Sequence, residues 1–411
     1  MRIQIVLLLI LMCMGGLASA SDLALVGSKI YTSPTEPPIE NGSIVIHDGK
    51  IVAVGSTTAI KIPKKADVID CEGLVVTAGF WNSHVHILPP GLLHAEKQSA
   101  QEINSQLQQM FTKWGFTTVF DVASILQNTN LIRRRIKSGE VLGPRILTVG
   151  EPFWVKNGTP IYVKRYLEEN HVSIPEVESI AQAKERVHQQ IQNGANGIKI
   201  FANSIEQNTV LTMPLELAQA IVTEAHAEHK PVFAHVTNDA GIVVALKSGV
   251  DILAHTAPNG TPWSPSLVQQ MTSTHTALTP TLTLWDEEAK KGNASEEETV
   301  REIGRGAAQL KVFSQAGGQV LFGTDIGYIQ HYDTSEEFTW MSRAGMSFPQ
   351  ILASLTTNPA QRFGYSAHSG RIAKGMDADL VVLNGDPGSE ITAFSDVRYT
   401  IRAGKIIYSK K

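Results

Sequence analysis

Cysteine is almost absent from this 411-residue chain, which contains only Cys13 and Cys71. Cys13 lies in an N-terminal segment that we expect to be removed, so the mature chain would keep Cys71 alone. A single cysteine cannot form an internal disulfide, and it cannot build a multi-thiolate zinc site. Any bound metal must therefore rely on nitrogen and oxygen ligands.

Charge is also sparse. Charged residues make up 18% of the chain, and the net charge is −4 at pH 7. The short basic run at residues 133–135 is interpreted as a solvated helix face, so we expect no nucleic-acid partner. A hydrophobic fraction of 43% and this length favour a globular enzyme with one large and one smaller domain.

The first twenty residues differ from the rest of the chain. Arg2 precedes an apolar run at residues 3–12, and Ala18-Ser19-Ala20 has the small side chains of a cleavage site. We predict a signal peptide at residues 1–20 that is cleaved near Ala20, giving an exported, periplasmic or secreted protein. The apolar run is too short for stable membrane insertion.

The expected secondary structure changes twice along the remaining sequence. Residues 21–77 have the pattern of β-strands, with a hairpin turn at Asp48-Gly49, and the β pattern returns over residues 366–411 around Ala403-Gly404. Each segment is too small to bury a core alone. We therefore predict that 21–77 and 366–411 form one composite β-sandwich domain.

Short apolar strands alternate with helical segments over residues 78–365. This alternation predicts an α/β fold with a parallel sheet, and its length favours a closed (β/α)8 TIM barrel. No Gly-rich phosphate loop follows the first strand, which disfavours an open doubly wound sheet.

Potential metal ligands lie in or just after five of these apolar strands. Because barrel strands are parallel, donors at their C-terminal ends converge on one point. The donors, in chain order, are His84, His86, Lys199, His235, His255 and Asp325.

The local patterns add chemical detail. His84 and His86 flank Val85, and strand side chains alternate, so both imidazoles face the same way. Lys199 lies within an apolar strand, where burial lowers the pKa of its amine. A neutral amine can react with carbon dioxide to give a carbamate, a carboxylate that is able to bridge two metals.

Each donor alone has an ordinary explanation, such as a core histidine, a lysine in a salt bridge or a helix-capping aspartate. Four of the thirteen histidines nevertheless fall at these strand positions, and the whole set favours a two-metal site. His226 and His229 precede a strand instead of ending one, and we interpret them as a solvated helix face.

These residues resemble the amidohydrolase superfamily. The resemblance also covers the opening segment 48–55 and the tail 370–383. The segment 195–200 around Lys199 is similar to the binuclear, carboxylated-lysine branch, which includes prolidase-like and carboxypeptidase-like hydrolases; imidazolonepropionase-related enzymes share the frame. The chain departs from the family pattern at Asn82, where Asp is common, and at Ala78, where Pro is common.

The resemblance implies specific roles. His84, His86 and Asp325 would hold one divalent metal, and His235 and His255 the other. A carbamate on Lys199 and a hydroxide would bridge them, and Asp325 would be the catalytic residue that carries a proton to the leaving nitrogen. We expect zinc, although manganese, iron and nickel suit the same ligands.

The expected function is hydrolysis of a carbon–nitrogen bond in a small-molecule or dipeptide-like substrate. Lactone or ester hydrolysis by the same site is the alternative, ahead of a mononuclear deaminase or imidazolonepropionase-like enzyme and a non-catalytic scaffold. Loops at 158–162 and 327–332 offer Tyr162 and Tyr328 as substrate contacts. A homo-oligomer is compatible with the sequence.

Overall fold

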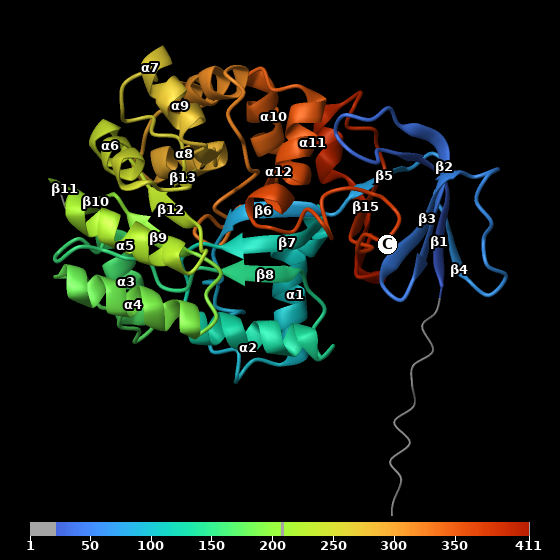
Figure 1. Cartoon of the computed structure of the whole chain (residues 1–411), viewed down its shortest axis with the longest axis horizontal. Coiled ribbons are helices and arrows are strands. Elements are labelled where there is room, and N and C mark those ends of the chain that lie inside the picture. Colours follow the sequence, from blue (N-terminus) through green and yellow to red (C-terminus); the bar gives the residue numbers. More distant parts are fainter. Residues whose placement is uncertain (1–21, 207–208, 411) are drawn as a thin grey trace, which may run out of the picture.

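The structure is a computed structural model that describes residues 22–206 and 209–410 (Figure 1). The predicted signal peptide at residues 1–20 lies outside the described residues. Two sets of strands organise the rest. One set joins the two ends of the chain, and the other lies amid the helices and carries the candidate ligands.

Strands from both ends of the described chain form one eight-stranded sheet, in the order β17-β16-β15-β5-β1-β2-β3. The sheet branches at β1, whose first half pairs with β4 and whose second half pairs with β5, both in parallel. The strands are β1 (Leu23–Ile30), β2 (Ile39–His47), β3 (Lys50–Ser56), β4 (Asp67–Asp70), β5 (Val75–Ala78), β15 (Leu380–Leu383), β16 (Val397–Arg402) and β17 (Lys405–Ser409).

The two predicted hairpins have the backbone that their sequences favour. Asp48 and Gly49 both have positive φ, 46° and 73°, and so do Ala403 and Gly404, at 48° and 73°. Two consecutive positive φ values define the type I′ turn, which matches the twist of the paired strands. Buried side chains of this branched sheet form an apolar core of their own, which includes Leu25, Ile44, Val382 and Ile401.

Parallel strands form two further sheets, of three and four strands. The first has the order β6-β7-β8 and the second β14-β13-β12-β9. The strands are β6 (Phe80–Val85), β7 (Phe116–Asp121), β8 (Arg145–Thr148), β9 (Ile198–Phe201), β12 (Val232–His235), β13 (Ile252–Ala254) and β14 (Ala277–Thr279).

Isolated parallel bridges link these sheets at both edges. Phe153 bridges to Ile200 on one side, and segment 320–326 bridges from Leu278 of β14 to Val85 of β6 on the other. Residues 320–324 of that segment, predicted as a strand, make an isolated bridge and single backbone hydrogen bonds to their neighbours, and the backbone turns after them at Asp325, where φ is 65°. The predicted α/β fold is confirmed, and it is of the TIM-barrel type.

Helices alternate with these strands and cover them (Figure 1). They are α1 (Ala100–Met110), α2 (Leu126–Lys137), α3 (Ile161–Glu169), α4 (Ile180–Gln192), α5 (Leu215–Ala227), α6 (Asp239–Ser248), α7 (Pro265–Ser273), α8 (Leu282–Lys291), α9 (Glu296–Gln315), α10 (Ser335–Arg343), α11 (Phe348–Leu355) and α12 (Thr357–Arg362). A hairpin of β10 (Asn203–Glu206) and β11 (Thr209–Thr212) extends beyond β9, and 3-10 turns lie at Thr112–Trp114 and Ile391–Ser395.

Within the described part of the chain, every helix is too short or too polar to cross a membrane.

Candidate metal centre

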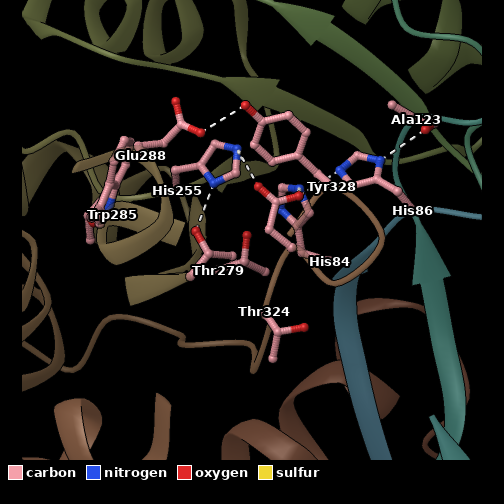
Figure 2. Close-up of polar contacts among 12 residues, drawn as sticks. His84, His86, Ala123, His255, Thr279, Trp285, Glu288, Thr324 and Tyr328 are labelled. Carbon is pink, nitrogen blue, oxygen red and sulfur yellow. Dashed lines mark hydrogen bonds and ion pairs between the residues drawn. The ribbon is translucent and has the colours of Figure 1, made fainter. Parts of the chain in front are cut away.

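His84, His86 and Asp325 form a compact group at the C-terminal end of β6. Their nearest ligand atoms all lie within 4.8 Å of one another. Oδ1 of Asp325 is 2.7 Å from Nε2 of His86 and 3.4 Å from Nε2 of His84. Figure 2 shows both imidazoles turned toward the same space.

The other three predicted ligands line the same cavity as this group. Nε2 of His255 is 3.9 Å from Oδ2 of Asp325, and the ring of His255 lies 4.5 Å from that of His84, centroid to centroid. The ring of His235 is 4.9 Å from that of His255, and Lys199 is 1% exposed beneath the cavity. The fold therefore brings all six donors together.

Backbone hydrogen bonds between the end of β6 and the segment 320–326 position the first group. The backbone N–H of Asp325 donates to the carbonyl of His84 (2.9 Å), and that of His86 donates to the carbonyl of Ile326 (2.8 Å). Asn82, which departs from the family pattern, is fully buried and donates to Oγ1 of Thr324 at 2.7 Å. The amide therefore joins β6 to the segment that carries Asp325.

Hydrogen bonds behind the rings settle which nitrogens face the cavity. Nδ1 of His86 must donate to the carbonyl of Ala123 (2.9 Å), since a carbonyl only accepts. Thr281 donates its hydroxyl to Pro280, so that hydroxyl accepts from Nδ1 of His255 at 2.7 Å. In both rings Nδ1 is thus the donor to the backbone or hydroxyl behind it, which leaves Nε2 toward the cavity as the nitrogen that could coordinate a metal.

Buried polar atoms without hydrogen-bond partners lie in the group formed by His84, His86 and Asp325. Both ring nitrogens of His84 and Oδ1 of Asp325 are buried and lack a hydrogen-bond partner among the described residues. Nε2 of His86 lies 2.7 Å from Oδ1 of Asp325, and the two atoms are both acceptors whenever no proton is on Nε2. Buried acceptors that face one another are unfavourable unless a cation or a proton lies between them. The donor set therefore fits a divalent metal.

Electrostatics prepare these groups as ligands. Burial lowers the pKa of His84 and of His235 to about 3, so both rings are neutral at physiological pH. Burial opposes ionisation of Asp325, but His84 and His86 hold its pKa well below the usual range. Burial also lowers the pKa of Lys199 to about 7, against the opposing charge of Asp325. A large fraction of this amine is neutral at pH 7.

The backbone is strained where the ligands emerge. Asp325 has a φ of 65°, Thr281 a φ of 45° and His255 a φ of 132°, although none of them is glycine. Such conformations cost about 1–3 kcal/mol each and are held by the surrounding structure, often at functional sites. Gly327 has a φ of 104°, and a Cβ there would lie 2.0 Å from the carbonyl oxygen of His86.

Comparison with known proteins places this site in a family. The model of the amidohydrolase family matches residues 75–407. The chain belongs to the amidohydrolase family. It is therefore a hydrolase of the class that acts on carbon–nitrogen bonds, as its ligand motifs predicted.

Individual amidohydrolases are distant relatives. Ochratoxinase from Aspergillus niger is 23% identical, over 90% of this chain and 83% of the relative. A crystal structure of a putative prolidase from Bifidobacterium longum has a TM-score of 0.79 at 24% identity, covering 95% of this chain and 96% of the other. A Xaa-Pro dipeptidase with bound methionine has a TM-score of 0.80 at 23% identity, covering 95% and 100%.

A cavity of about 170 Å³ lies over the six donors of this amidohydrolase. Its walls are mainly apolar and aromatic. Tyr162 and Tyr328, the predicted substrate contacts, both line it, with ring centroids 5.4 Å apart. The predicted loop position of Tyr162 is wrong: the residue lies in the first turn of α3, because Pro160 at the N-cap has a fixed φ of −56° that suits a helix start.

Sequence reasoning missed several residues around the site. Asp121 ends an apolar strand as Asp325 does, and that signal was available in the sequence. Glu288 and Glu302 lie on helical segments with no local mark of function, yet both line the cavity. Glu288 accepts a hydrogen bond from the hydroxyl of Tyr328 at 2.8 Å (Figure 2).

His226 and His229, which were interpreted as a solvated helix face, do not line the cavity. Nε2 of His226, in α5, pairs with Asp251 at 2.8 Å, and the His226 side chain is 42% exposed. His229 follows the same helix.

Proposed function

We propose that this protein is an exported, metal-dependent amidohydrolase that cleaves the carbon–nitrogen bond of a small amide with a bulky apolar group. The observation that carries the proposal is the convergence of six nitrogen and oxygen donors at the floor of one apolar cavity.

Two divalent ions account for this donor set. His84, His86 and Asp325 would hold one ion, and His235 and His255 the other, with a carbamate on Lys199 between them. The partly neutral amine of Lys199 supports the carbamate, because only the neutral form reacts with carbon dioxide. We expect zinc in both positions.

The metal ions, when bound, would lower the pKa of a water molecule and polarise the carbonyl of the substrate. Asp325 would accept the proton of the attacking water and deliver it to the leaving nitrogen. The surrounding backbone holds its carboxylate against His84 and His86 in the wall of the cavity.

The walls of the cavity indicate the substrate class. Trp154, Tyr162, Phe201, Trp285 and Tyr328 surround the donors. Aromatic walls favour a substrate with an apolar or aromatic side group, held largely by burial of apolar surface. Relatives named as ochratoxinase, prolidase and Xaa-Pro dipeptidase support amide and peptide substrates.

The proposal also includes the architecture and the location. We take segment 320–326 and the seven parallel strands as one closed (β/α)8 barrel over residues 78–365, because bridges occur at both sheet edges. Residues 21–77 and 366–411 would be the composite β domain. Export after cleavage near Ala20 rests on the composition of residues 1–20.

Metal analysis tests the proposal first. We expect two metal ions per chain in the purified protein and one or none in Lys199→Ala. One ion unaffected by this substitution would overturn the two-metal centre. N-acyl amino acids and dipeptides with aromatic side chains, each beside its ester or lactone analogue, then test the bond. Cleavage of the esters or lactones without cleavage of the matching amides would replace the amide assignment with ester hydrolysis.

A further inference from the structure

A buried carboxylate that the proposed reaction does not use lies directly behind His86. Asp121 ends β7 and is fully buried. Its carboxylate accepts three hydroxyl hydrogen bonds, from Ser124 at 2.5 Å, Thr148 at 2.8 Å and Thr129 at 3.1 Å. Burying an ionisable group is costly, and three donors to one carboxylate offset this cost only where the local structure keeps them in place.

The first of these bonds leads to the candidate metal centre. Ser124 donates to Oδ1 of Asp121, and the same hydroxyl oxygen accepts the backbone N–H of Ile87 at 2.8 Å. The neighbouring residue, Ala123, accepts the Nδ1–H of His86 at 2.9 Å. One short loop therefore holds both the ring of His86 and the backbone that follows it.

The other two hydrogen bonds of Asp121 join elements that lie away from His86. Oδ2 of Asp121 accepts from Thr148 of β8 and Thr129 of α2, and it ties those elements to the end of β7. The two carboxylate oxygens thus have separable roles. Oδ1 faces the loop behind His86, and Oδ2 faces the packing between strand and helix.

We propose that Asp121 is a positioning residue that sets the ring orientation of His86 through Ser124 and Ala123. The inference rests on the proposed function, since it concerns a ligand of the proposed metal centre. His86 lies just past the last residue of β6, so the loop bond to Ala123 fixes which ring nitrogen faces the cavity. Partners of this kind typically change metal affinity by about 10–100-fold when they are removed.

The two oxygens provide matched variants. Asp121→Asn keeps the shape but replaces one acceptor oxygen with an NH2 group, so the hydroxyl donors cannot all be satisfied. Ser124→Ala removes the hydroxyl that bonds both Oδ1 of Asp121 and the backbone N–H of Ile87, and it leaves the hydrogen bonds of Oδ2 in place. Thr129→Val removes a hydroxyl from the Oδ2 side alone and is the control for a purely structural effect.

The experiment measures retention of metal by the full-length holoprotein against a chelator, beside the thermal midpoint of unfolding. We expect Asp121→Asn and Ser124→Ala to bind metal about 10–100-fold more weakly, and Thr129→Val to keep the wild-type affinity even where its unfolding midpoint falls. Excess metal should restore kcat in the first two variants with little change in KM.

Three outcomes would overturn the inference. The first is wild-type metal retention in both Asp121→Asn and Ser124→Ala, and the second is equal metal loss in Ser124→Ala and Thr129→Val. If Asp121→Asn does not fold, the pair Ser124→Ala and Thr129→Val decides alone. The third is a wild-type protein that binds no metal, which would overturn the proposed function as well; a metal-binding wild type with unaffected variants overturns the inference only.

Discussion

Asp325 contacts His84 twice, once through the backbone and once through the side chain. Its N–H donates to the carbonyl of His84 at 2.9 Å, and its Oδ1 lies 3.4 Å from Nε2 of the same histidine. A left-handed backbone at Asp325, with a φ of 65°, makes both contacts possible at once. The carboxylate is thus fixed by the sheet edge itself, and this rigidity underlies the first prediction.

Replacing the carboxylate of Asp325 with an amide should remove proton transfer and little else. We expect Asp325→Asn to lower kcat by at least about 100-fold, the low end for positioned acid–base catalysis. Steady-state kinetics on the best amide substrate measures the loss, and substrate affinity should persist. Turnover near that of the wild type would contradict the role of Asp325.

The second prediction concerns how recovery of activity depends on pH through the amine of Lys199. Its pKa is about 7 in the folded protein, below the ordinary 10.5, so the neutral form predominates above pH 7. Metal-free protein should regain activity faster with bicarbonate and metal as the pH rises through about 7. The same shift destabilises the metal-free fold as the pH falls from 10.5 toward 7, since the unfolded chain then binds more protons.

Recovery rates measured across this pH range test the idea, with Lys199→Ala as the control. The variant should show no dependence on bicarbonate. At a constant concentration of dissolved carbon dioxide, a recovery rate that falls as the pH rises, or one that is indifferent to bicarbonate, would rule out the carbamate.

Gly327 supports the third prediction. A Cβ at this position would lie 2.0 Å from the carbonyl oxygen of His86, which is backbone and cannot move aside. Gly327→Ala should therefore displace His86 and abolish metal retention. Gly345→Ala is the matched control: its φ is also positive, at 85°, but no atom lies within 4 Å of the added Cβ.

We expect Gly345→Ala to cost about 1–2 kcal/mol from the left-handed backbone alone and to keep its metal. Elemental analysis and thermal unfolding compare the two variants. Equal behaviour of the pair would show that the contact with His86 is unimportant.

The hydroxyl of Tyr328 supports the fourth prediction. It donates to Glu288 at 2.8 Å, and Lys291 lies 3.1 Å from the same carboxylate oxygen. Removing a hydrogen bond to a charged group costs about 1.5–3 kcal/mol, enough for a loss of about tenfold or more if the pair shapes the bound substrate.

Tyr328→Phe should therefore lower kcat/KM by about tenfold. Tyr408→Phe is the control, because Tyr408 lies in β17 and does not line the cavity, and it should leave kcat/KM close to the wild-type value. Kinetics on an amide with an aromatic side group separates the two, and an equal effect of both substitutions would argue against the Glu288 pair.

The convergence of the six candidate donors could be predicted because strand geometry is local. Alternation placed His84 and His86 on one face, and parallel strands brought Lys199, His235 and His255 to the same end. The surroundings of the site could not be predicted in this way. Thr281, in a strained turn, accepts a hydrogen bond from the ring of His255, and Glu288 lines the cavity from a helix. The placement of both residues depends on packing between distant segments.

Two local predictions failed. Residues 320–324 were predicted as a regular strand, but they make only scattered backbone hydrogen bonds and an isolated bridge at Val320. Tyr162 was assigned to a loop, although Pro160 favours the start of α3.

The branched terminal sheet has a consequence for the order of assembly. β5 leads directly into β6, which carries His84, and β5 is held by β15, so that Val76 pairs with Val382, about 300 residues later. The N–H of Gly79, between β5 and β6, also donates to the carbonyl of Asp379 at 2.7 Å. Contacts between residues so distant in sequence form slowly, because a large loop must close first. The first ligand-bearing strand is therefore anchored late in folding, and the capacity to hold metal should be among the last properties that a newly made chain acquires.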